Sequence, residues 1–208
     1  MSTAQRPRYL ALGDSYTIGE GVAVEARWPN RLARALAEDG IDLASPEIIA
    51  TTGWSTDELK SGIAEAAPQP PYALASLLIG VNNQYRGRDA DNYAKEFAEL
   101  LAFAIDMSDS RPGRVLVVSI PDWGVTTFAA TEGRDLQRIA REIDAFNAVA
   151  RGQAQSAGCA FVDITGISRQ CGDDPAMLAE DGLHPSAEQH ARWLPPILTA
   201  ARRCLARD

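Results

Sequence analysis

The stretch Tyr9-Leu-Ala-Leu-Gly-Asp-Ser-Tyr16 decides the fold of this chain. Residues 9–12 predict a short apolar strand that ends at Gly13. Gly13 supplies the conformational freedom for a sharp turn, and we expect Asp14 to accept a backbone hydrogen bond that stabilises this turn. A turn from the strand into a helix would lift the Ser15 hydroxyl above the edge of a sheet.

Four further apolar runs predict strands, and helical patterns separate them. The predicted strands are 47–50, 73–79, 115–120 and 160–164. The predicted helices are 28–37, 55–67, 91–107, 132–155 and 186–205. We expect the last helix to bend at Pro195-Pro196, because proline cannot donate the hydrogen bond of a helix interior.

Strands that alternate with helices indicate a parallel sheet covered on both faces. No internal repeat or low-complexity segment interrupts this order, so we predict one domain over residues 1–208. The expected architecture is a three-layer α/β/α, flavodoxin-like fold with a doubly wound, five-stranded parallel sheet. Such sheets bind ligands beyond the carboxyl ends of their strands. The residues that follow each strand therefore indicate the function.

The charge of the chain excludes several classes of partner. A formal net charge of −8 argues against nucleic-acid binding, which needs clustered lysine and arginine, and would repel an anionic membrane. No run approaches the ~18 apolar residues of a transmembrane helix, so we predict no membrane span. The polar amino terminus lacks the apolar stretch of a secretory signal. We expect a cytoplasmic protein, unless a leader has been removed.

The three cysteines point to no metal or disulfide chemistry. Cys159, Cys171 and Cys204 are odd in number and widely spaced, with no C-x-x-C pair. This pattern is neither a disulfide framework nor a zinc site. It fits a reduced compartment, and nothing in the sequence indicates an oligomeric state.

Only two histidines are available as a general base. His184 lies on a loop, three residues after Asp181. This spacing lets the carboxylate accept from Nδ1, which fixes the tautomer and stabilises the protonated ring. Taken alone, the pair is equally well a loop or helix-cap pair. His190 lies in a helical pattern with no acid at that spacing, and its sequence context predicts a partly exposed helix residue.

Gly53 and Asn82 each follow a predicted strand. Gly53 can offer a backbone N–H, and Asn82 a side-chain amide, to negative charge that develops on a carbonyl oxygen. Alone, each is more simply a turn residue, and so is Ser15. Their shared position at one edge of the sheet, together with His184, favours a site where a base activates a serine nucleophile.

Four segments in this order resemble the sequence blocks of the GDSL, or SGNH, hydrolases. They are Gly13-Asp-Ser-Tyr16, Gly53, Gly80-Val-Asn-Asn83 and Asp181-Gly-Leu-His-Pro-Ser186. The resemblance spans residues 9–186. It implies a serine esterase with Ser15 as nucleophile, His184 as general base and Asp181 as its orienting acid. It also implies an oxyanion hole made by the Ser15 N–H, the Gly53 N–H and the Asn82 amide, and a small-molecule ester as substrate without cofactor or metal.

Two positions depart from the family pattern. Tyr16 stands in place of the usual leucine, which should alter the shape of the pocket without touching the mechanism. Asn83 stands where an aspartate often follows the catalytic asparagine, so the family pattern does not define the turn there. Several large or polar side chains lie on predicted loops after strands, where they line a substrate pocket or simply pack: Tyr16, Trp54, Asn83, Tyr85, Trp123 and Phe128.

Alternative functions follow from the same segments. The Gly13-to-Gly21 stretch, rich in glycine, serine and threonine, could cradle a phosphate or nucleotide at a helix start in a flavodoxin-like module. It has no P-loop lysine and carries Asp14 and Glu20, where negative charge is unwelcome. A catalytically silent binding protein of the same fold is another alternative. The absence of a G-x-S-x-G elbow argues against the α/β-hydrolase fold.

Overall fold

A computed structural model describes residues 6–172 and 174–206. Its centre is one sheet of five parallel strands in the order β2-β1-β3-β4-β5. The strands are β1 (Tyr9–Gly13), β2 (Glu47–Ala50), β3 (Leu74–Leu78), β4 (Val115–Val118) and β5 (Ala160–Val162). The chain steps from β1 out to β2 and returns past β1 to β3, so strand order reverses beside β1. The predicted doubly wound parallel sheet is confirmed.

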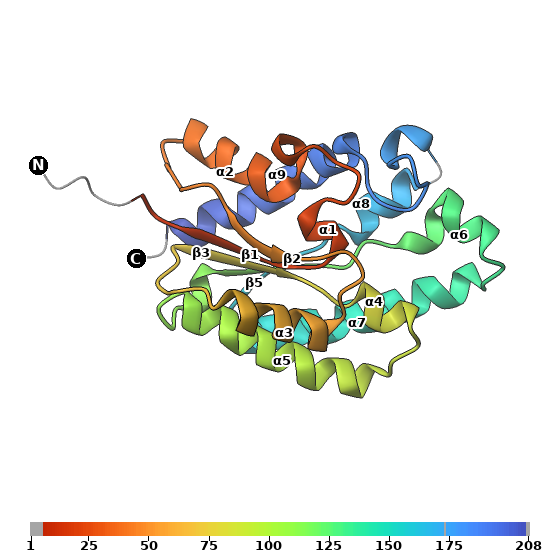
Figure 1. Cartoon of the computed structure of the whole chain (residues 1–208), viewed down its shortest axis with the longest axis horizontal. Coiled ribbons are helices and arrows are strands. Elements are labelled where there is room, and N and C mark those ends of the chain that lie inside the picture. Colours follow the sequence, from red (N-terminus) through yellow and green to blue (C-terminus); the bar gives the residue numbers. More distant parts are fainter. Residues whose placement is uncertain (1–5, 173, 207–208) are drawn as a thin grey trace, which may run out of the picture.

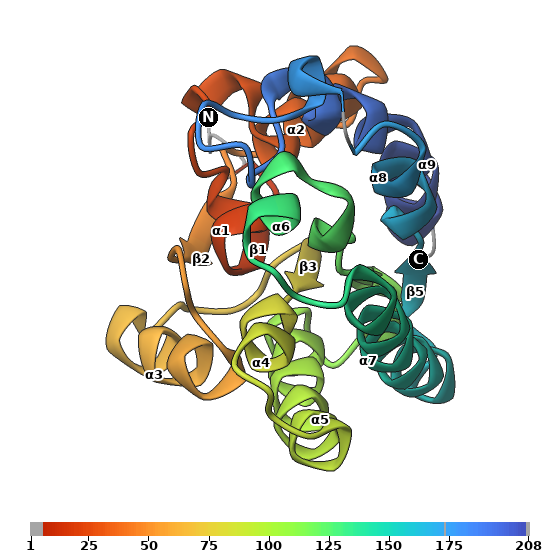
Figure 2. The ribbon, with the colours of Figure 1, turned by 90° about the vertical axis from the view of Figure 1, so that its right-hand side faces the viewer.

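Helices cover both faces of the sheet and complete three layers (Figure 1). One face carries α1 (Ser15–Ile18), α2 (Trp28–Glu38), α8 (Thr165–Gln170) and α9 (Ala187–Leu205). The other carries α3 (Thr56–Ala66), α4 (Val81–Tyr85), α5 (Ala90–Met107) and α7 (Leu136–Ala157). The short helix α6 (Thr127–Thr131) lies at the carboxyl end of the sheet, close to α1 and α4 in the view along the strands (Figure 2).

Short elements at the carboxyl end were missing from the sequence prediction. They are α1, α4, α6 and α8, and the 3₁₀ turns Val24–Ala26, Trp123–Val125 and Pro175–Met177. The 3₁₀ turn Pro112–Arg114, which lies directly before β4 at the opposite end, was missing as well. Helices of four to six residues do not complete the two turns that make hydrophobic periodicity readable.

The long helix α7 begins at Leu136 and not at 132, because Gly133 has a left-handed backbone and Asp135 caps the helix through its side chain. Helix α9 runs on through Pro195 and Pro196.

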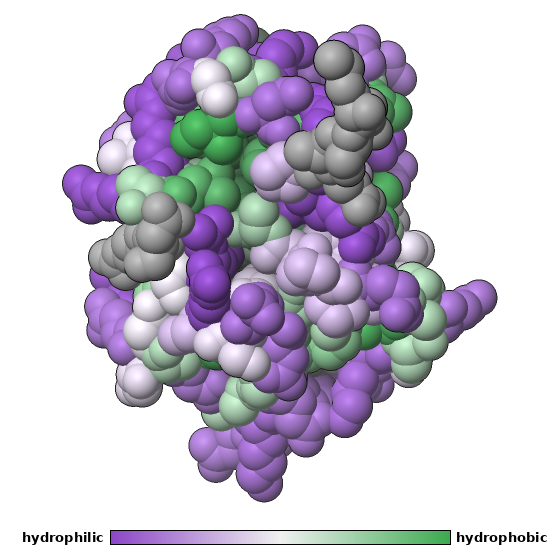
Figure 3. Space-filling model, turned by 90° about the vertical axis from the view of Figure 1, so that its left-hand side faces the viewer, coloured by the Kyte–Doolittle hydropathy of each residue, from purple (hydrophilic) through white to green (hydrophobic). Residues whose placement is uncertain are grey.

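At the opposite end of the sheet, hydrophilic side chains surround an apolar patch (Figure 3). A cavity of about 390 Å³ lies there, and arginines line much of it. Arg6 pairs with Asp42, and Arg8 pairs with Glu47 at 2.7 Å. These ion pairs tie the residues before β1 to Asp42, before β2, and to Glu47, the first residue of β2. Within the described ranges, no helix is long and apolar enough to cross a membrane.

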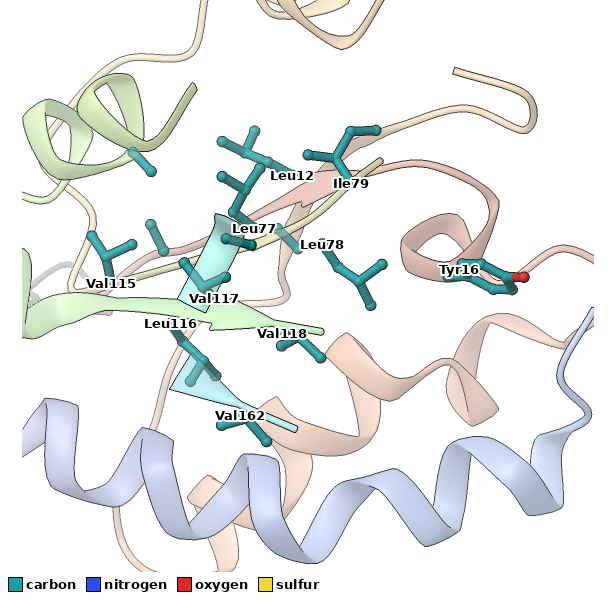
Figure 4. Close-up of a cluster of buried hydrophobic side chains, with 14 of the residues drawn as sticks. Leu12, Tyr16, Leu77, Leu78, Ile79, Val115, Leu116, Val117, Val118 and Val162 are labelled. Carbon is teal, nitrogen blue, oxygen red and sulfur yellow. The ribbon is translucent and has the colours of Figure 1, made fainter. Parts of the chain in front are cut away.

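The sheet supplies the core. Leucine and valine side chains from adjacent strands pack against one another, and Tyr16 lies beyond the strand ends (Figure 4). Leu12, Leu77 and Val117 have no exposed surface. Burying a side chain of this kind contributes about 1.5–3 kcal/mol. Buried strands on both faces explain why the sequence shows continuous apolar runs and no alternation.

Gly13 is required by contact and not by backbone freedom, so the reason predicted from the sequence is wrong. Gly13 does not have a positive φ. A methyl group at Gly13 would lie 2.1 Å from Thr17 Oγ1 and 2.4 Å from the Leu78 carbonyl oxygen. The absence of a side chain therefore lets the first turn of α1 pack directly over the ends of β1 and β3.

The prediction that His190 is partly exposed is also wrong. The residue is completely buried, because helix α9 turns it toward α2. Its Nδ1 accepts a hydrogen bond of 3.1 Å from the Trp28 N–H, and its ring lies 5.0 Å from that of Trp193. Burial lowers the pKa of His190 to about 3, so the ring is neutral and structural at physiological pH.

The contact at Gly13 predicts a large loss of stability in Gly13→Ala. Because one of the clashing atoms is backbone, it cannot rotate away, and we expect a loss of about 2–3 kcal/mol. Urea denaturation followed by circular dichroism measures it. Gly152→Ala is the matched control: Gly152 lies inside α7 with open space around its Cα. That control should gain about 0.5–1 kcal/mol, and equal effects of the two changes would contradict the packing argument.

Candidate active site

A cavity of about 230 Å³ opens at the carboxyl end of the sheet. Four of the residues singled out in the sequence line it, namely Ser15, Gly53, Asn82 and His184. They come from α1, from the turn after β2, from α4 and from the loop before α9. Segments up to about 170 residues apart in sequence therefore meet at one place, as the carboxyl ends of parallel strands require.

Ser15 is the first residue of α1 and is almost fully buried. Asp14 caps this helix, accepting a hydrogen bond of 3.0 Å from the Tyr16 N–H, which confirms its predicted role in the turn. Asp14 has no exposed surface, and this burial raises its pKa to about 7 although backbone N–H groups oppose the shift. The side chain that shapes the Ser15 turn is thus a buried carboxyl group.

Asp181 holds both the ring and the backbone of His184. One carboxylate oxygen lies 2.5 Å from Nδ1 of the ring, and the other accepts from the N–H groups of Leu183 and His184 at 2.9 Å each. Partial burial acts to raise the pKa of Asp181, but these hydrogen bonds outweigh it and keep the pKa below its usual range. The carboxylate is therefore charged at neutral pH, and the other ring nitrogen, Nε2, is left for another partner.

Helix α6 fixes the loop that carries His184. The Gly182 carbonyl accepts from the Phe128 N–H at 3.0 Å and from the Thr127 hydroxyl at 3.1 Å. On the other side of the loop, the Ala179 N–H donates to the His184 carbonyl at 2.7 Å. No pattern in the sequence marks Thr127 as part of the site, since α6 is too short to leave a periodic signal.

Two of the three predicted donors of the oxyanion hole, Asn82 and Gly53, are held by hydrogen bonds. Asn82 uses one amide hydrogen to donate to the Trp54 carbonyl at 2.9 Å, which leaves the second one. Gly53 has a left-handed backbone with φ of 89°. Arg86 donates to the Gly53 carbonyl at 2.7 Å and pairs with Glu58 at 2.9 Å. Arg86, which the sequence analysis did not single out, therefore fixes the turn that carries the Gly53 N–H.

Four of the six residues considered for the pocket line it: Tyr16, Tyr85, Trp123 and Phe128. The rings of Tyr85 and Trp123 lie edge to face with centroids 5.3 Å apart. The indole N–H of Trp123 donates to Gln84 at 2.8 Å, which fixes the ring in place. With Val81 and Leu183, these side chains give the cavity a largely apolar wall.

Asn83 and Trp54 do not line the cavity. Asn83 is buried, accepts from the Thr56 N–H at 3.1 Å and donates to the Thr56 hydroxyl at 2.6 Å. It therefore joins α4 to the start of α3, a role the sequence could not separate from pocket lining. The Trp54 ring lies over Gly62, where an added methyl group would be 2.1 Å from the ring.

Ser15 and His184 share the cavity, but no hydrogen bond joins their side chains in the part of the chain that the structure describes. Catalytic hydrogen bonds are often long or poorly aligned without substrate and tighten only in the complex. A proton transfer between the two would require a hydrogen bond that forms when substrate binds. Their catalytic roles stay predictions.

Comparison with known proteins identifies the class. A family model described as the GDSL-like Lipase/Acylhydrolase family matches residues 11–192. The chain belongs to this family and is a carboxylic ester hydrolase. No curated relative matches it in sequence.

Solved structures show the same fold at low sequence identity. The chain is similar to TesA, with a TM-score of 0.71 and 20% identity over 95% of this chain and 99% of that one. It is also similar to a variant of Axe2, an acetyl xylan esterase from Geobacillus stearothermophilus, with a TM-score of 0.71 and 20% identity over 100% of both chains. An extracellular lipase from Streptomyces rimosus has a TM-score of 0.65 and 21% identity over 93% of this chain and 99% of that one.

The buried Asp14 carboxyl predicts a pH dependence of stability. The carboxyl of an unfolded chain has a pKa of about 3.9, whereas burial raises that of the folded protein to about 7. Between these values the unfolded chain releases a proton that the folded protein retains, so stability falls as the pH rises. Asp14→Asn keeps an acceptor for the Tyr16 N–H but removes the titration. We expect its free energy of unfolding to fall less steeply than that of wild type between pH 4 and pH 7. The difference between the two slopes should reach up to about 1.4 kcal/mol per pH unit.

Urea denaturation at a series of pH values tests this expectation. Asp57→Asn is a suitable control, because hydrogen bonding to Arg88 lowers the pKa of Asp57 to about 2, so its titration lies below the pH range measured. Parallel stability curves for wild type and Asp14→Asn would show that Asp14 does not titrate as argued.

Proposed function

We propose that the protein hydrolyses esters through an acyl-enzyme on Ser15, with His184 as general base and Asp181 as its orienting acid. One observation carries the proposal: Ser15 and the Asp181-paired His184 line the same cavity as Gly53 and Asn82. Ester cleavage needs a nucleophile, a base and oxyanion donors within reach of one carbonyl group. The family match supports ester hydrolysis as the reaction.

The reaction proceeds in two acyl transfers. His184 takes the Ser15 proton while Ser15 Oγ attacks the ester carbonyl, and Asp181 stabilises the imidazolium that forms. The resulting oxyanion is stabilised by the Ser15 and Gly53 N–H groups and the second amide hydrogen of Asn82. The C–O bond to the alcohol then breaks, and His184 returns its proton to the leaving oxygen. Water repeats the sequence on the acyl-enzyme and releases the acid.

The cavity favours an uncharged, apolar ester. Aromatic and aliphatic side chains form most of its wall, and no lysine or arginine belongs to the described residues that line it. At its edge, the Thr52 hydroxyl donates to the Glu20 carboxylate. An anionic ligand would meet this negative charge without a compensating cation. This argues against the phosphate- or nucleotide-binding alternative, and the small volume favours short acyl or alcohol groups.

A covalent probe tests the nucleophile. Wild type treated with a fluorophosphonate should carry one adduct, which mass spectrometry locates on Ser15, and should hydrolyse p-nitrophenyl acetate in the presence of EDTA. Ser15→Ala should lose both labelling and turnover, because no other group replaces the attacking oxygen. Ser61→Ala, which removes an exposed hydroxyl of α3, should retain both. A protein that folds but neither labels nor hydrolyses any ester would instead support the catalytically silent alternative.

Loss of the Asp181 charge tests the base. In Asp181→Asn the amide cannot stabilise a protonated His184, so we expect kcat to fall on the order of 10²-fold or more. The effect should appear in kcat and not in KM, since Asp181 does not line the cavity. Glu180→Gln removes the neighbouring exposed carboxylate and should change kcat by less than twofold. An equally small change in Asp181→Asn would remove Asp181 from the mechanism.

A further inference from the structure

Tyr16 stands between the active-site cavity and a second, smaller cavity. The second cavity has a volume of about 20 Å³ and lies behind the site, toward α8 and α9. Three residues line both cavities: Tyr16, Trp123 and Leu183. The hydrogen bond to Gln84 holds Trp123, and Leu183 belongs to the loop fixed by Asp181. Tyr16, which follows Ser15 in α1, is the third residue of this shared wall.

The position of Tyr16 is well defined. Its ring meets those of His184 and Trp193 edge to face, with centroid distances of 6.1 and 6.4 Å. Its carbonyl accepts a hydrogen bond of 3.1 Å from the Trp28 indole. The ring is almost fully buried and points away from the strands, beyond their carboxyl ends (Figure 4). A side chain held on several sides forms a fixed wall rather than a mobile cover.

The second cavity could receive the end of an apolar chain once the Tyr16 ring is removed. Most of its wall is apolar, including Met177, Leu178 and Trp193. At one side lie two buried polar atoms without a hydrogen-bond partner among the described residues, the Gln189 side-chain oxygen and the Trp193 indole nitrogen. Its volume of about 20 Å³ is enough for one water molecule, which needs ~10–15 Å³, so the space is small as long as the Tyr16 ring stays in place.

We propose that Tyr16 is the specificity-determining residue that ends the substrate pocket and restricts this esterase to short chains. The proposal rests on the proposed function, because the chain in question belongs to the ester that Ser15 attacks. A smaller side chain at position 16 joins the two cavities and adds the space of the ring to the pocket. The ester chain can then extend past the position of the ring into the apolar second cavity.

The experiment compares chain-length profiles of Tyr16→Leu, Tyr16→Phe and wild type. One series of p-nitrophenyl esters varies the acyl group from acetate to decanoate, and a series of alkyl acetates varies the alcohol. A methylene that becomes buried contributes about 0.8 kcal/mol, or about fourfold in kcat/KM. In one of the two series, the ratio of kcat/KM for the eight-carbon chain to that for the two-carbon chain should rise at least tenfold in Tyr16→Leu.

Two controls separate the end wall from a general change in the pocket. Tyr16→Phe keeps the ring and should leave the profile of wild type unchanged. Tyr85→Leu removes a ring that lines the active-site cavity but not the second one, so it should not produce the shift. An unchanged profile in Tyr16→Leu, or an equal shift in Tyr85→Leu, would overturn the proposal. Thermal unfolding confirms that each variant folds, and Tyr16→Val is a second substitution if leucine packs poorly.

Binding without turnover distinguishes this proposal from the proposed function. Ser15→Ala and the double variant Ser15→Ala/Tyr16→Leu are titrated with octanoate and octanol in a calorimeter. We expect the double variant to bind one of them at least tenfold more tightly than the single variant. This result would support the end wall even if no ester were hydrolysed, and equal affinities would overturn it even if Ser15 proved to be the nucleophile.

Discussion

The close approach at Gly13 is the constraint on which the site depends. With no side chain at this position, the Thr17 hydroxyl and the Leu78 carbonyl occupy the space where a methyl group would be. Helix α1 can therefore begin immediately after β1, directly above the edge of the sheet. This packing places Ser15 near the end of β3, beyond which Asn82 lies on α4. A side chain at position 13 would push α1 away, and Ser15 would move from Gly53 and Asn82, with which it shares the cavity.

The frame of the fold was largely predictable because its signals are local. Continuous apolar runs identified all five strands within two residues, and their alternation with long helices predicted a parallel sheet. The short helices and turns at the carboxyl end were missed, since they are too brief to show a period. Their positions are set by tertiary contacts, such as the hydrogen bonds from α6 to the Gly182 carbonyl. These elements build most of the pocket, so the sequence indicated where the site lies better than how it is shaped.

The same distinction applies to single residues. The sequence alone was enough to group four residues at one site, because each follows a strand or belongs to a motif: Ser15, Gly53, Asn82 and His184. Arg86 could not, because nothing local shows that its guanidinium reaches the Gly53 carbonyl. His190 was misjudged for a related reason: whether a helix residue faces solvent or another helix depends on how α2 and α9 pack. The sequence thus indicates which residues can take part in the chemistry. Their burial and their hydrogen-bond partners depend on how the helices pack in the folded protein.

The attachment of α6 to the His184 loop has a consequence for how this enzyme could change. Thr127 and Phe128 hold the Gly182 carbonyl, and Phe128 also forms part of the pocket wall. Helix α6 thus forms part of the pocket wall and also holds the loop that carries the His184 ring. A change in α6 that enlarges the pocket for bulkier esters would also displace His184, because these hydrogen bonds join the helix to its loop. A change at Tyr16 leaves these hydrogen bonds of α6 in place.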